Sequence, residues 1–263
     1  MKPVRLLAIA GSDSSGGAGI QADIKTASAL GAYAMTAITA VTAQDTTGVG
    51  SIHLVPADVV REQIERCLWD IGADAIKIGM LGSREIAESV VAALTRCAKD
   101  IPIVVDPVMA ATSGSELAGD AVVDVLKSSF FPLAQLITPN LPEAERLCGF
   151  SLQSGDDLLR AGQALLALGP RAVLIKGGHG GSNTVNDLLF TPDESPRAYI
   201  AKRVDTKNTH GTGCTLATAI ACGLCEGMPL GDAIQRAHDF VQCAIRSAPG
   251  FGSGNGPIDH LQR

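Results

Sequence analysis

Short apolar runs and amphipathic segments alternate along most of this chain. Residues 6–10 form an apolar run of strand length, and after a Ser/Gly loop apolar residues recur at helical spacing over 20–30. A strand-like run at 35–44 and a helical pattern introduced by Pro56 repeat this order. Repeated strand–helix units predict a mostly parallel sheet, because parallel neighbours need a crossover between them.

The same alternation continues with strand patterns at 75–80, 101–108 and 136–138 and helix patterns at 83–99 and 122–126. It changes between 173 and 204, where runs at 173–176, 185–190 and 199–204 have only turns between them, which predicts antiparallel strands. Helices are predicted at 214–224 and 230–245, and the Gly/Ser-rich segment 250–256 is expected to be loose. We therefore predict one α/β domain over 1–263: a central, mostly parallel sheet with helices on both faces and antiparallel strands toward the C-terminal third.

Composition narrows the class of protein. The chain of 263 residues is 46% hydrophobic but only 3% aromatic, as expected where helices pack closely on parallel strands. Its net charge of −6, without a basic run, argues against nucleic-acid binding. Neither a secretory signal nor an apolar run of roughly 20 residues is found, so we expect a soluble, cytoplasmic protein. The seven scattered cysteines indicate reduced thiols, and Cys222 and Cys225 suit a helix core better than a zinc site.

A glycine-rich turn stands directly before the apolar helix at 214–224. Gly211, Thr212 and Gly213 let several backbone N–H groups converge, and the helix dipole adds positive potential, so the turn is a candidate phosphate site. Cys214 would lie in the first helical turn, where the same field lowers a thiol pKa and lets the sulfur accept a proton. A buried thiol without a role is the alternative. His210 is either a phosphate contact or a loop-packing residue.

The glycine loop from Gly11 to Gly19 admits a rival interpretation. It is not a P-loop, since the Gly-Lys-Ser/Thr ending is absent. Its last part does match a relaxed dinucleotide-binding fingerprint. The acidic residue that would hold a ribose is not cleanly present, because the second strand ends in Gln44 followed by Asp45. Dinucleotide binding remains an alternative.

Charged residues follow several of the predicted strands, at the edge where open α/β sheets bind ligands. Asp106 and Glu143 could hold hydrated Mg²⁺, which prefers a few carboxylates together with water and phosphate oxygens. Alternatively, Glu143 and Asn140 only cap a helix. Lys176 could reach into the site or remain on the surface. Asp23 lies at the edge of an apolar helical stripe, where it either complements the helix dipole or binds a ligand.

These segments resemble the hydroxymethylpyrimidine/phosphomethylpyrimidine kinases of thiamine biosynthesis, a branch of the ribokinase-like superfamily that includes pyridoxal kinases. Seven motifs in family order carry the resemblance, from near residue 6 to the last helices. They are Gly11-Ser-Asp-Ser-Ser-Gly-Gly-Ala-Gly-Ile-Gln-Ala-Asp23, Ala40-Val-Thr-Ala-Gln44, Lys77-Ile-Gly-Met80, Asp106-Pro-Val-Met, Thr138-Pro-Asn140-Leu-Pro-Glu143, Lys176-Gly-Gly-His179 and Asn208-Thr-His-Gly-Thr-Gly-Cys214-Thr.

The resemblance implies a ribokinase-like fold, ATP and Mg²⁺ as cofactors, and a homodimer, since relatives are commonly dimers. It also assigns site residues. The implied pyrimidine pocket contains Gln44, Gly11, Asp23, Met80 and Val108; the implied nucleotide and metal contacts are Asn140, Glu143, Lys176, Thr209, His210 and Asp106; the implied anion hole and base are Gly211, Thr212, Gly213 and Cys214. Many superfamily members carry aspartate where this chain has Cys214, and cysteine at this position is similar to the pyrimidine kinases.

The expected function is therefore ATP-dependent phosphorylation of a hydroxymethylpyrimidine to its monophosphate and then to its diphosphate. Three alternatives remain open from the sequence. A pyridoxal kinase would share the fold and the chemistry. A dinucleotide-binding protein, or a sensor that binds a pyrimidine without phosphorylating it, would use the same pocket differently.

Overall fold

A computed structural model describes residues 2–111, 114–178 and 183–262 of the chain. The strands are β1 (Arg5–Asp13), β2 (Tyr33–Gln44), β3 (Val49–Leu54), β4 (Ala75–Ile78), β5 (Ile103–Val105), β6 (Leu136–Ile137), β7 (Val173–Ile175), β8 (Thr184–Thr191) and β9 (Glu194–Lys202). The helices are α1 (Gly19–Ala29), α2 (Ala57–Arg66) continued by η1 (Cys67–Ile71), α3 (Arg84–Cys97), α4 (Asp120–Val125) continued by η2 (Leu126–Phe130) and η3 (Phe131–Leu133), α5 (Leu141–Cys148), α6 (Gly155–Leu166), α7 (Thr212–Cys225) and α8 (Leu230–Arg246).

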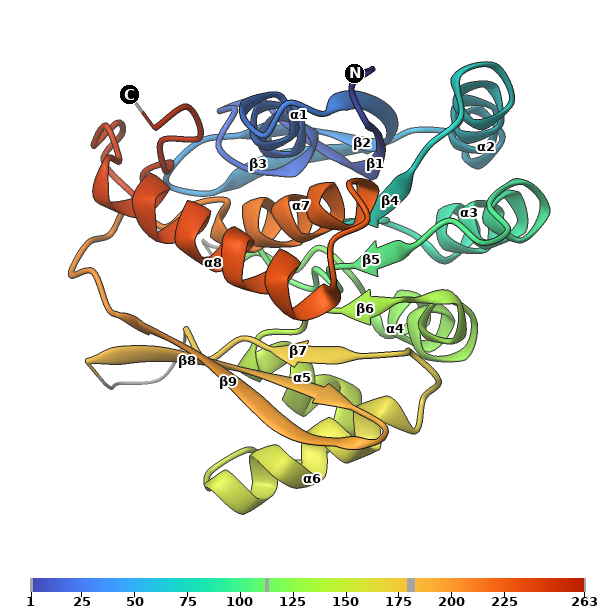
Figure 1. Ribbon diagram of the computed structural model, residues 1–263. Coiled ribbons are helices and arrows are strands. Elements are labelled where there is room, and N and C mark those ends of the chain that lie inside the picture. The colour runs from blue at the N-terminus through green and yellow to red at the C-terminus, as the bar shows by residue number, and fades with distance from the viewer. Residues whose placement is uncertain (1, 112–113, 179–182, 263) are drawn as a thin grey trace.

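The described residues form one nine-stranded sheet in the order β3-β2-β1-β4-β5-β6-β7-β8-β9 (Figure 1). The pairs from β2 through β1 to β7 are parallel, while β7–β8 and β8–β9 are antiparallel. The predicted fold class is confirmed, including the antiparallel strands of the C-terminal third. One strand was not predicted: β3 runs antiparallel to β2 at the other edge, and its exposed side chains leave no buried pattern to detect.

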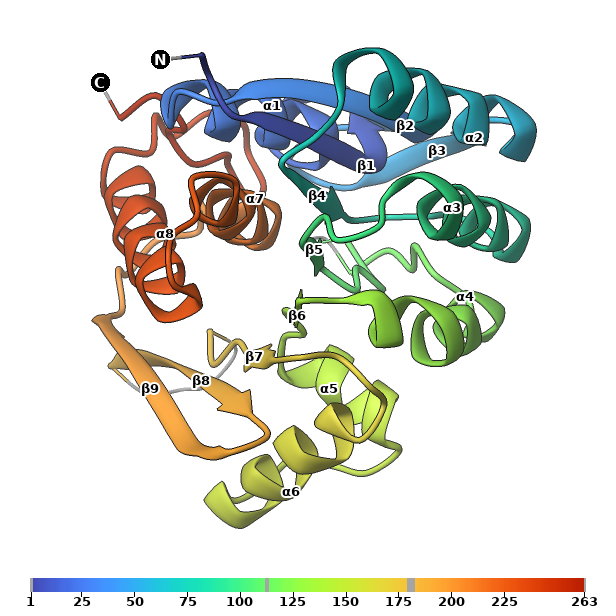
Figure 2. The same ribbon diagram turned by 45° about the vertical axis from the view of Figure 1, so that its right-hand side comes forward.

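Helices cover both faces of the sheet, as Figure 2 shows, with α2, α3 and α4 on one side and α7 and α8 on the other. Successive residues of a buried strand point to opposite faces, so each strand supplies two cores. Leu7 and Ile76 pack with the α2–α6 side, whereas their neighbours Leu6 and Ala75 pack with α1, α7 and α8. Small residues on α7 let this helix lie close to the strands.

One predicted strand is shorter in the structure, and one helix was not predicted. The strand expected over 101–108 is limited to Ile103–Val105, because the chain leaves the sheet at Asp106 and places the following residues at the sheet edge. Helix α6 was not predicted. Its start is marked by a capping box in which Ser154 and Asp157 each satisfy a backbone N–H of the other.

All seven cysteines lie in the described part of the chain, where they are free. Within that part, no helix combines the length and the apolar character needed to cross a bilayer.

Candidate active site

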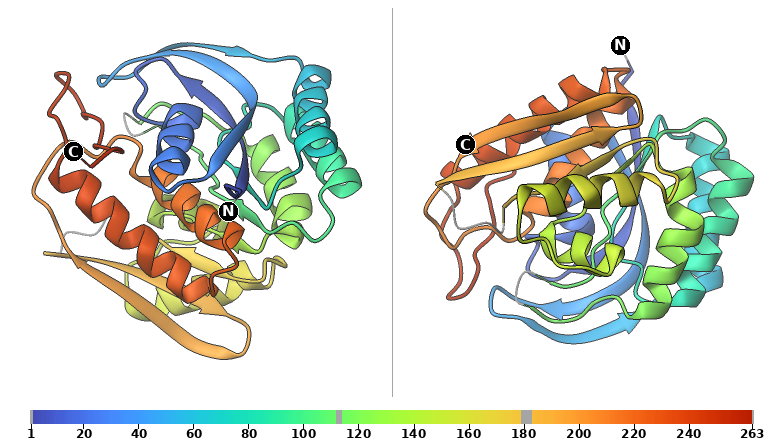
Figure 3. Two further views of the ribbon diagram at one scale, coloured as in Figure 1. Left: turned by 45° about the horizontal axis from the view of Figure 1, so that its top comes forward. Right: turned by 90° about the horizontal axis from the view of Figure 1, so that it is seen from below.

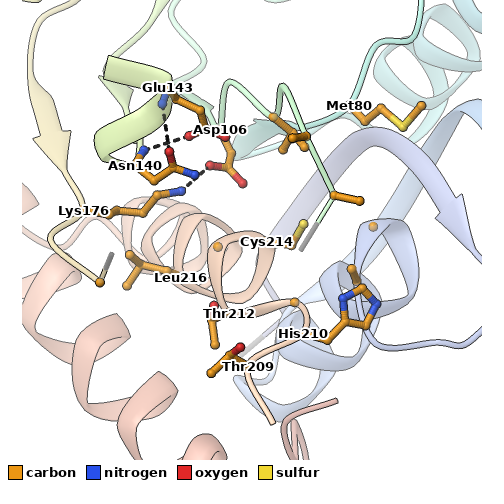
Figure 4. A pocket seen from close by; sticks show the side chains of 18 of the residues that line it. Met80, Asp106, Asn140, Glu143, Lys176, Thr209, His210, Thr212, Cys214 and Leu216 are labelled. Atoms are coloured by element: carbon orange, nitrogen blue, oxygen red, sulfur yellow. Dashed lines mark hydrogen bonds and ion pairs between the residues drawn. The ribbon is translucent and has the colours of Figure 1, made fainter. Parts of the chain in front are cut away.

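A cavity of about 870 Å³ opens along the edge where the parallel strands end. Its size suits two small-molecule ligands meeting in one site. Fourteen predicted site residues line it: Gly11, Gln44, Met80, Asp106, Val108, Asn140, Glu143, Lys176, Thr209, His210, Gly211, Thr212, Gly213 and Cys214. Figure 4 shows the side chains of Asp106 and Lys176 close together, with Cys214 at the start of α7.

The turn before α7 is shaped for an anion. Gly211 is the N-cap of the helix with φ +86°, and a Cβ there would overlap the carbonyl oxygen of Gly17. Only glycine fits this contact, which joins the turn to the glycine loop through backbone alone. The first N–H groups of a helix have no partner within the helix, so those of Gly213 and Cys214 are available at the cavity wall.

An ion pair stands over the same turn. Lys176 follows β7, and its Nζ lies 2.8 Å from Asp106 Oδ1, while Thr138 Oγ1 donates to that oxygen at 3.1 Å. A Cβ on Gly213 would lie 3.3 Å from Lys176 Nζ and 3.5 Å from Asp106 Oδ2. The ammonium is therefore placed beside the anion turn, where it can contact a phosphate held by the turn.

Glu143 and Asn140 form a capping box at the start of α5. The Asn140 side chain accepts from the Glu143 N–H at 2.9 Å, and Glu143 Oε2 accepts from the Asn140 N–H at 2.8 Å. Burial, together with the charge of Asp106, raises the pKa of Glu143 to about 7, although Lys176 opposes this rise. The capping interpretation is thus confirmed.

Asp23 does not lie on the cavity wall, in contrast to its predicted role in substrate binding. It is fully buried on α1, and both of its oxygens lie 2.9 Å from Nζ of Lys77, which is also fully buried on β4. Thr218 donates to the same carboxylate at 2.6 Å. The inward bias of Asp23 in the sequence reflects this ion pair beneath the cavity.

Cys214 is the third residue of α7 and reaches the cavity. Burial raises the pKa of its thiol to about 11, although the charge of Lys77 lowers it. The expected lowering of this pKa is therefore wrong. Desolvation of the thiolate raises the thiol pKa by more than the charge of Lys77 lowers it.

Sequence reasoning missed Asp13, which organises the glycine loop. Its carboxylate accepts from the N–H groups of Ser15, Gly17 and Ala18 at 2.8, 3.1 and 2.8 Å and lies 2.8 Å from His210 Nε2. Burial alone would raise the pKa of Asp13, but hydrogen bonds from His210 and Ser15 lower it overall. His210 therefore has a loop-packing role. An aspartate followed by serines and glycines is typical of a turn in which the aspartate side chain accepts from nearby backbone N–H groups. That pattern was the available signal in the sequence.

A second buried pair at the cavity wall was also missed. His238 Nε2 on α8 lies 3.4 Å from Asp187 Oδ2 on β8, and the other oxygen of Asp187 accepts from the Gly177 N–H at 2.8 Å. The glycines after Lys176 are thereby held against β8. His179 of the same predicted motif lies outside the described residues.

The predicted pyrimidine end of the cavity lies near the end of β2. Gln44 is partly buried there, with its backbone fixed to Ser14 by hydrogen bonds of 2.7 and 2.8 Å. Its side-chain oxygen accepts from Thr42 at 3.2 Å. Met80 and Gly11 form an adjoining wall, where a Cβ on Gly11 would approach the Met80 sulfur at 3.0 Å.

The segment 250–256 is ordered, which corrects the prediction of a loose tail. After α8 it reaches the turn between β2 and β3 (Figure 3, left), where the Asn255 N–H donates to the Thr46 carbonyl at 2.8 Å. The Gly256 carbonyl accepts from the His210 N–H at 3.1 Å. A Cβ on Gly254 would overlap the Thr46 carbonyl, so the glycines serve close backbone contact here.

Comparison with known proteins gives a consistent set of similarities. A family model described as phosphomethylpyrimidine kinase matches residues 13–259. The chain is 46% identical over 256 residues to a thiamine biosynthesis bifunctional protein of Geobacter sulfurreducens, covering 97% of this chain but only 52%, about half, of that protein. It is 45% identical over 263 residues to a hydroxymethylpyrimidine/phosphomethylpyrimidine kinase of Mycobacterium bovis, covering 100% and 96%. The solved ADP complex of Bacillus subtilis pyridoxal kinase superposes with a TM-score of 0.91 at 35% identity, covering 98% of each chain.

Proposed function

The chain belongs to the phosphomethylpyrimidine kinase family, and from this premise we propose its function. The chain is then an ATP-dependent kinase that phosphorylates 4-amino-5-hydroxymethyl-2-methylpyrimidine and afterwards its monophosphate, as a step toward thiamine diphosphate. One observation carries the proposal: a single cavity contains the backbone anion turn, Lys176 beside it and Cys214 within it. Phosphoryl transfer depends mainly on positioning and on charge stabilisation, and these groups supply both.

Gln44 is the proposed reader of the pyrimidine. A carboxamide offers one acceptor and two donors, which complement an aminopyrimidine edge that carries a donor beside a ring-nitrogen acceptor. Met80 and the backbone around Gly11 and Val108 provide apolar walls for the ring. For Gln44→Ala we expect the KM for the pyrimidine to rise roughly 10-fold or more, with little change in the KM for ATP. The reverse pattern would remove Gln44 from the substrate site.

The nucleotide phosphates would lie along the turn before α7. The N–H groups of Gly213 and Cys214 and the ammonium of Lys176 can stabilise the γ-phosphoryl group, with Thr209 and Thr212 at the rim. ATP use is supported by the similarity to a kinase solved with ADP.

Mg²⁺ is proposed to bind near Asp106 and Glu143. Burial raises the pKa of Glu143, and the charge of Asp106 adds to this rise, which is the situation a divalent cation relieves. In the described residues no group of three or more Asp, Glu, His or Cys forms a protein-only metal site. Two carboxylates suit a cation that keeps waters and takes further ligands from phosphate oxygens. When bound, it would neutralise charge on the phosphates.

Cys214 is the proposed proton acceptor in the first phosphorylation. Because the thiol pKa of Cys214 is raised to about 11, the thiol first loses its own proton to solvent. The substrate hydroxyl oxygen then forms a bond to the γ-phosphorus, the bond from that phosphorus to the ADP oxygen breaks, and the hydroxyl proton passes to the Cys214 thiolate. ADP and the phosphomonoester leave, and the thiol later returns its proton to solvent. In the second reaction a phosphate oxygen attacks, and Cys214 would then only orient it.

The direct test is to incubate the protein with ATP, Mg²⁺ and the pyrimidine alcohol and follow the products by mass spectrometry. Successive appearance of monophosphate and diphosphate is expected. Cys214→Ala should lower kcat for the first step by roughly 10² or more. Cys243→Ala is the matched control, because Cys243 is exposed on α8 and does not line the cavity. Nearly unchanged kcat in Cys214→Ala would contradict the proton-acceptor role.

Pyridoxal phosphorylation is the second candidate, because the superposed Bacillus subtilis structure is a pyridoxal kinase. Comparing kcat/KM for pyridoxal and for the pyrimidine alcohol decides between them. We expect the pyrimidine to be preferred and expect Gln44→Ala to narrow the preference. A higher kcat/KM for pyridoxal than for the pyrimidine alcohol in the wild type would make pyridoxal phosphorylation the main activity.

A homodimer is also proposed. Ile52 and Leu54 on edge strand β3 are about 40% exposed. They lie on one face of the strand, since they are two residues apart. Light scattering should give twice the monomer mass, and Ile52→Glu should lower it; a monomeric wild type would contradict the proposal.

The cytoplasm is the proposed compartment. Seven free thiols are typical of a reducing environment. Fractionation of the native host should place the protein with cytoplasmic markers, and recovery elsewhere would overturn this assignment.

A further inference from the structure

The ion pair between Lys77 and Asp23 is an unusual feature in the middle of the fold. Both side chains are fully buried, on β4 and α1, and the ammonium contacts both carboxylate oxygens at 2.9 Å. Burying two charges costs more than burying apolar groups of the same size, so stability alone does not account for such a pair. The position of the pair next to the helix that carries Cys214 suggests that it serves the reaction.

Thr218 connects the Lys77–Asp23 pair to α7, the helix that carries Cys214. Its hydroxyl donates to Asp23 Oδ1 at 2.6 Å, and it stands four residues after Cys214 on α7. Residues at this spacing share one helix face, and their side chains lean toward the helix N-terminus. The buried pair therefore lies behind Cys214, on the side away from the cavity mouth.

The charges of four groups, from four elements, act on the thiol of Cys214. Lys77 comes from β4 and Asp23 from α1, while Asp106 and Lys176 follow β5 and β7. Burial raises the thiol pKa, the charge of Lys77 lowers it, and the two carboxylates raise it again. Cys214 in turn helps to raise the pKa of Lys77. Lys77 is thus the cation whose charge most lowers the thiol pKa of Cys214.

We propose that Lys77 is a positioning residue for the phosphoryl transfer: its ammonium, held by Asp23 and Thr218, stabilises the Cys214 thiolate that receives the substrate proton. This inference rests on the proposed function. Lys77 keeps its own proton throughout, and only the hydroxyl proton moves, from the substrate oxygen to the sulfur. The effect therefore belongs to kcat and to thiol reactivity, and leaves the KM for ATP and for the pyrimidine nearly unchanged.

Three variants separate this role from a purely structural one. Lys77→Met leaves Asp23 buried without its partner and is expected to fold poorly. The double variant Asp23→Asn, Lys77→Met removes both charges and should recover a melting temperature near that of the wild type. Asp23→Asn alone keeps the lysine but removes the carboxylate charge that it is paired with. Each is compared by thermal unfolding, by steady-state kinetics and by the rate at which iodoacetamide alkylates Cys214, measured by peptide mass spectrometry at pH 9.

For the double variant we expect kcat to fall roughly 100-fold and alkylation of Cys214 to slow by roughly 10-fold, because the cation that favours the thiolate is gone. Asp23→Asn alone should alkylate faster than the wild type. Alkylation of the exposed Cys243 in the same samples is the internal control and should not change.

A folded double variant with wild-type kcat and wild-type alkylation would overturn the inference and leave Lys77 a structural residue. Equal or slower alkylation in Asp23→Asn would also contradict it. If the wild-type protein makes no phosphorylated pyrimidine, the proposed function fails, whereas the alkylation rates still test the link between Lys77 and Cys214.

Discussion

Two lysine–aspartate pairs flank the start of α7, and they differ in what surrounds them. Lys77 lies 2.9 Å from Asp23, and Lys176 lies 2.8 Å from Asp106. The Lys77 side chain is 0% exposed, whereas that of Lys176 is 13% exposed and lines the cavity. A sealed pair can act only through other protein groups, while an open pair can exchange its partner for a ligand. The same two residue types therefore acquire different functions from solvent access alone.

The largest difference should appear in stability. Lys77→Met leaves a carboxylate uncompensated in the core and is expected to lower the free energy of unfolding by about 3–5 kcal/mol. Lys176→Met should cost clearly less, because Asp106 borders the cavity, where water can solvate it. Urea unfolding of both variants measures the two losses. Equal losses would show that the two pairs are equivalent for folding.

The open pair should matter most for turnover. Lys176→Met removes a cation beside the anion turn and is expected to lower kcat/KM for ATP by roughly 10²–10³, as loss of one preorganised donor does. Steady-state kinetics with ATP as the varied substrate checks this. Lys25→Met is the control, because Lys25 contacts the glycine loop, through the Gly16 carbonyl at 2.7 Å, but does not line the cavity. A similar loss in both variants would point to loop packing.

Glu143, whose pKa responds to the charges of the open pair, should make the stability of the protein depend on pH near neutrality. The pKa of Glu143 is raised from 4.5 to about 7, so its contribution to stability is fully present below pH 4.5 and is lost as the pH rises through 7. Between pH 5 and 7, wild type should lose about 2 kcal/mol relative to Glu143→Gln, because a tenfold change in proton affinity corresponds to about 1.4 kcal/mol. Unfolding in metal-free buffer across this range gives the difference. Parallel curves for the two proteins would mean an ordinary pKa for Glu143.

The smallest expected effect concerns the hydroxyl that supports each aspartate. Thr218 donates to Asp23 at 2.6 Å and Thr138 to Asp106 at 3.1 Å. Thr218→Val should lower the free energy of unfolding by about 1.5 kcal/mol, since a hydrogen bond to a buried charge is lost. Thr138→Val should lose less, because the cavity can supply water to Asp106. A larger loss in Thr138→Val would reverse the contrast between the sealed and the open pair.

Strands with a buried pattern were predictable, and the strand without one was not. The apolar strands β1, β4 and β7 alternate with amphipathic helices, and that alternation predicted the parallel sheet and its ligand-binding edge. Strand β3 is exposed and carries no such pattern, so it was missed. The segment 250–256 has a composition typical of loose tails. It is ordered because glycines permit backbone contact with Thr46 and His210, which lie far away in the sequence.

The sequence by itself determined which chemical groups reach the sheet edge, because strand ends and glycine turns are local features. Only the tertiary structure decided how those groups behave. Asp23 and Asp106 are the same residue type, yet one is sealed in the core and the other lines the cavity. The Cys214 thiol pKa is raised instead of lowered, because desolvation by distant segments outweighs the local field of its own helix. Burial and long-range charge depend on the packing of the whole chain, and no local pattern encodes them.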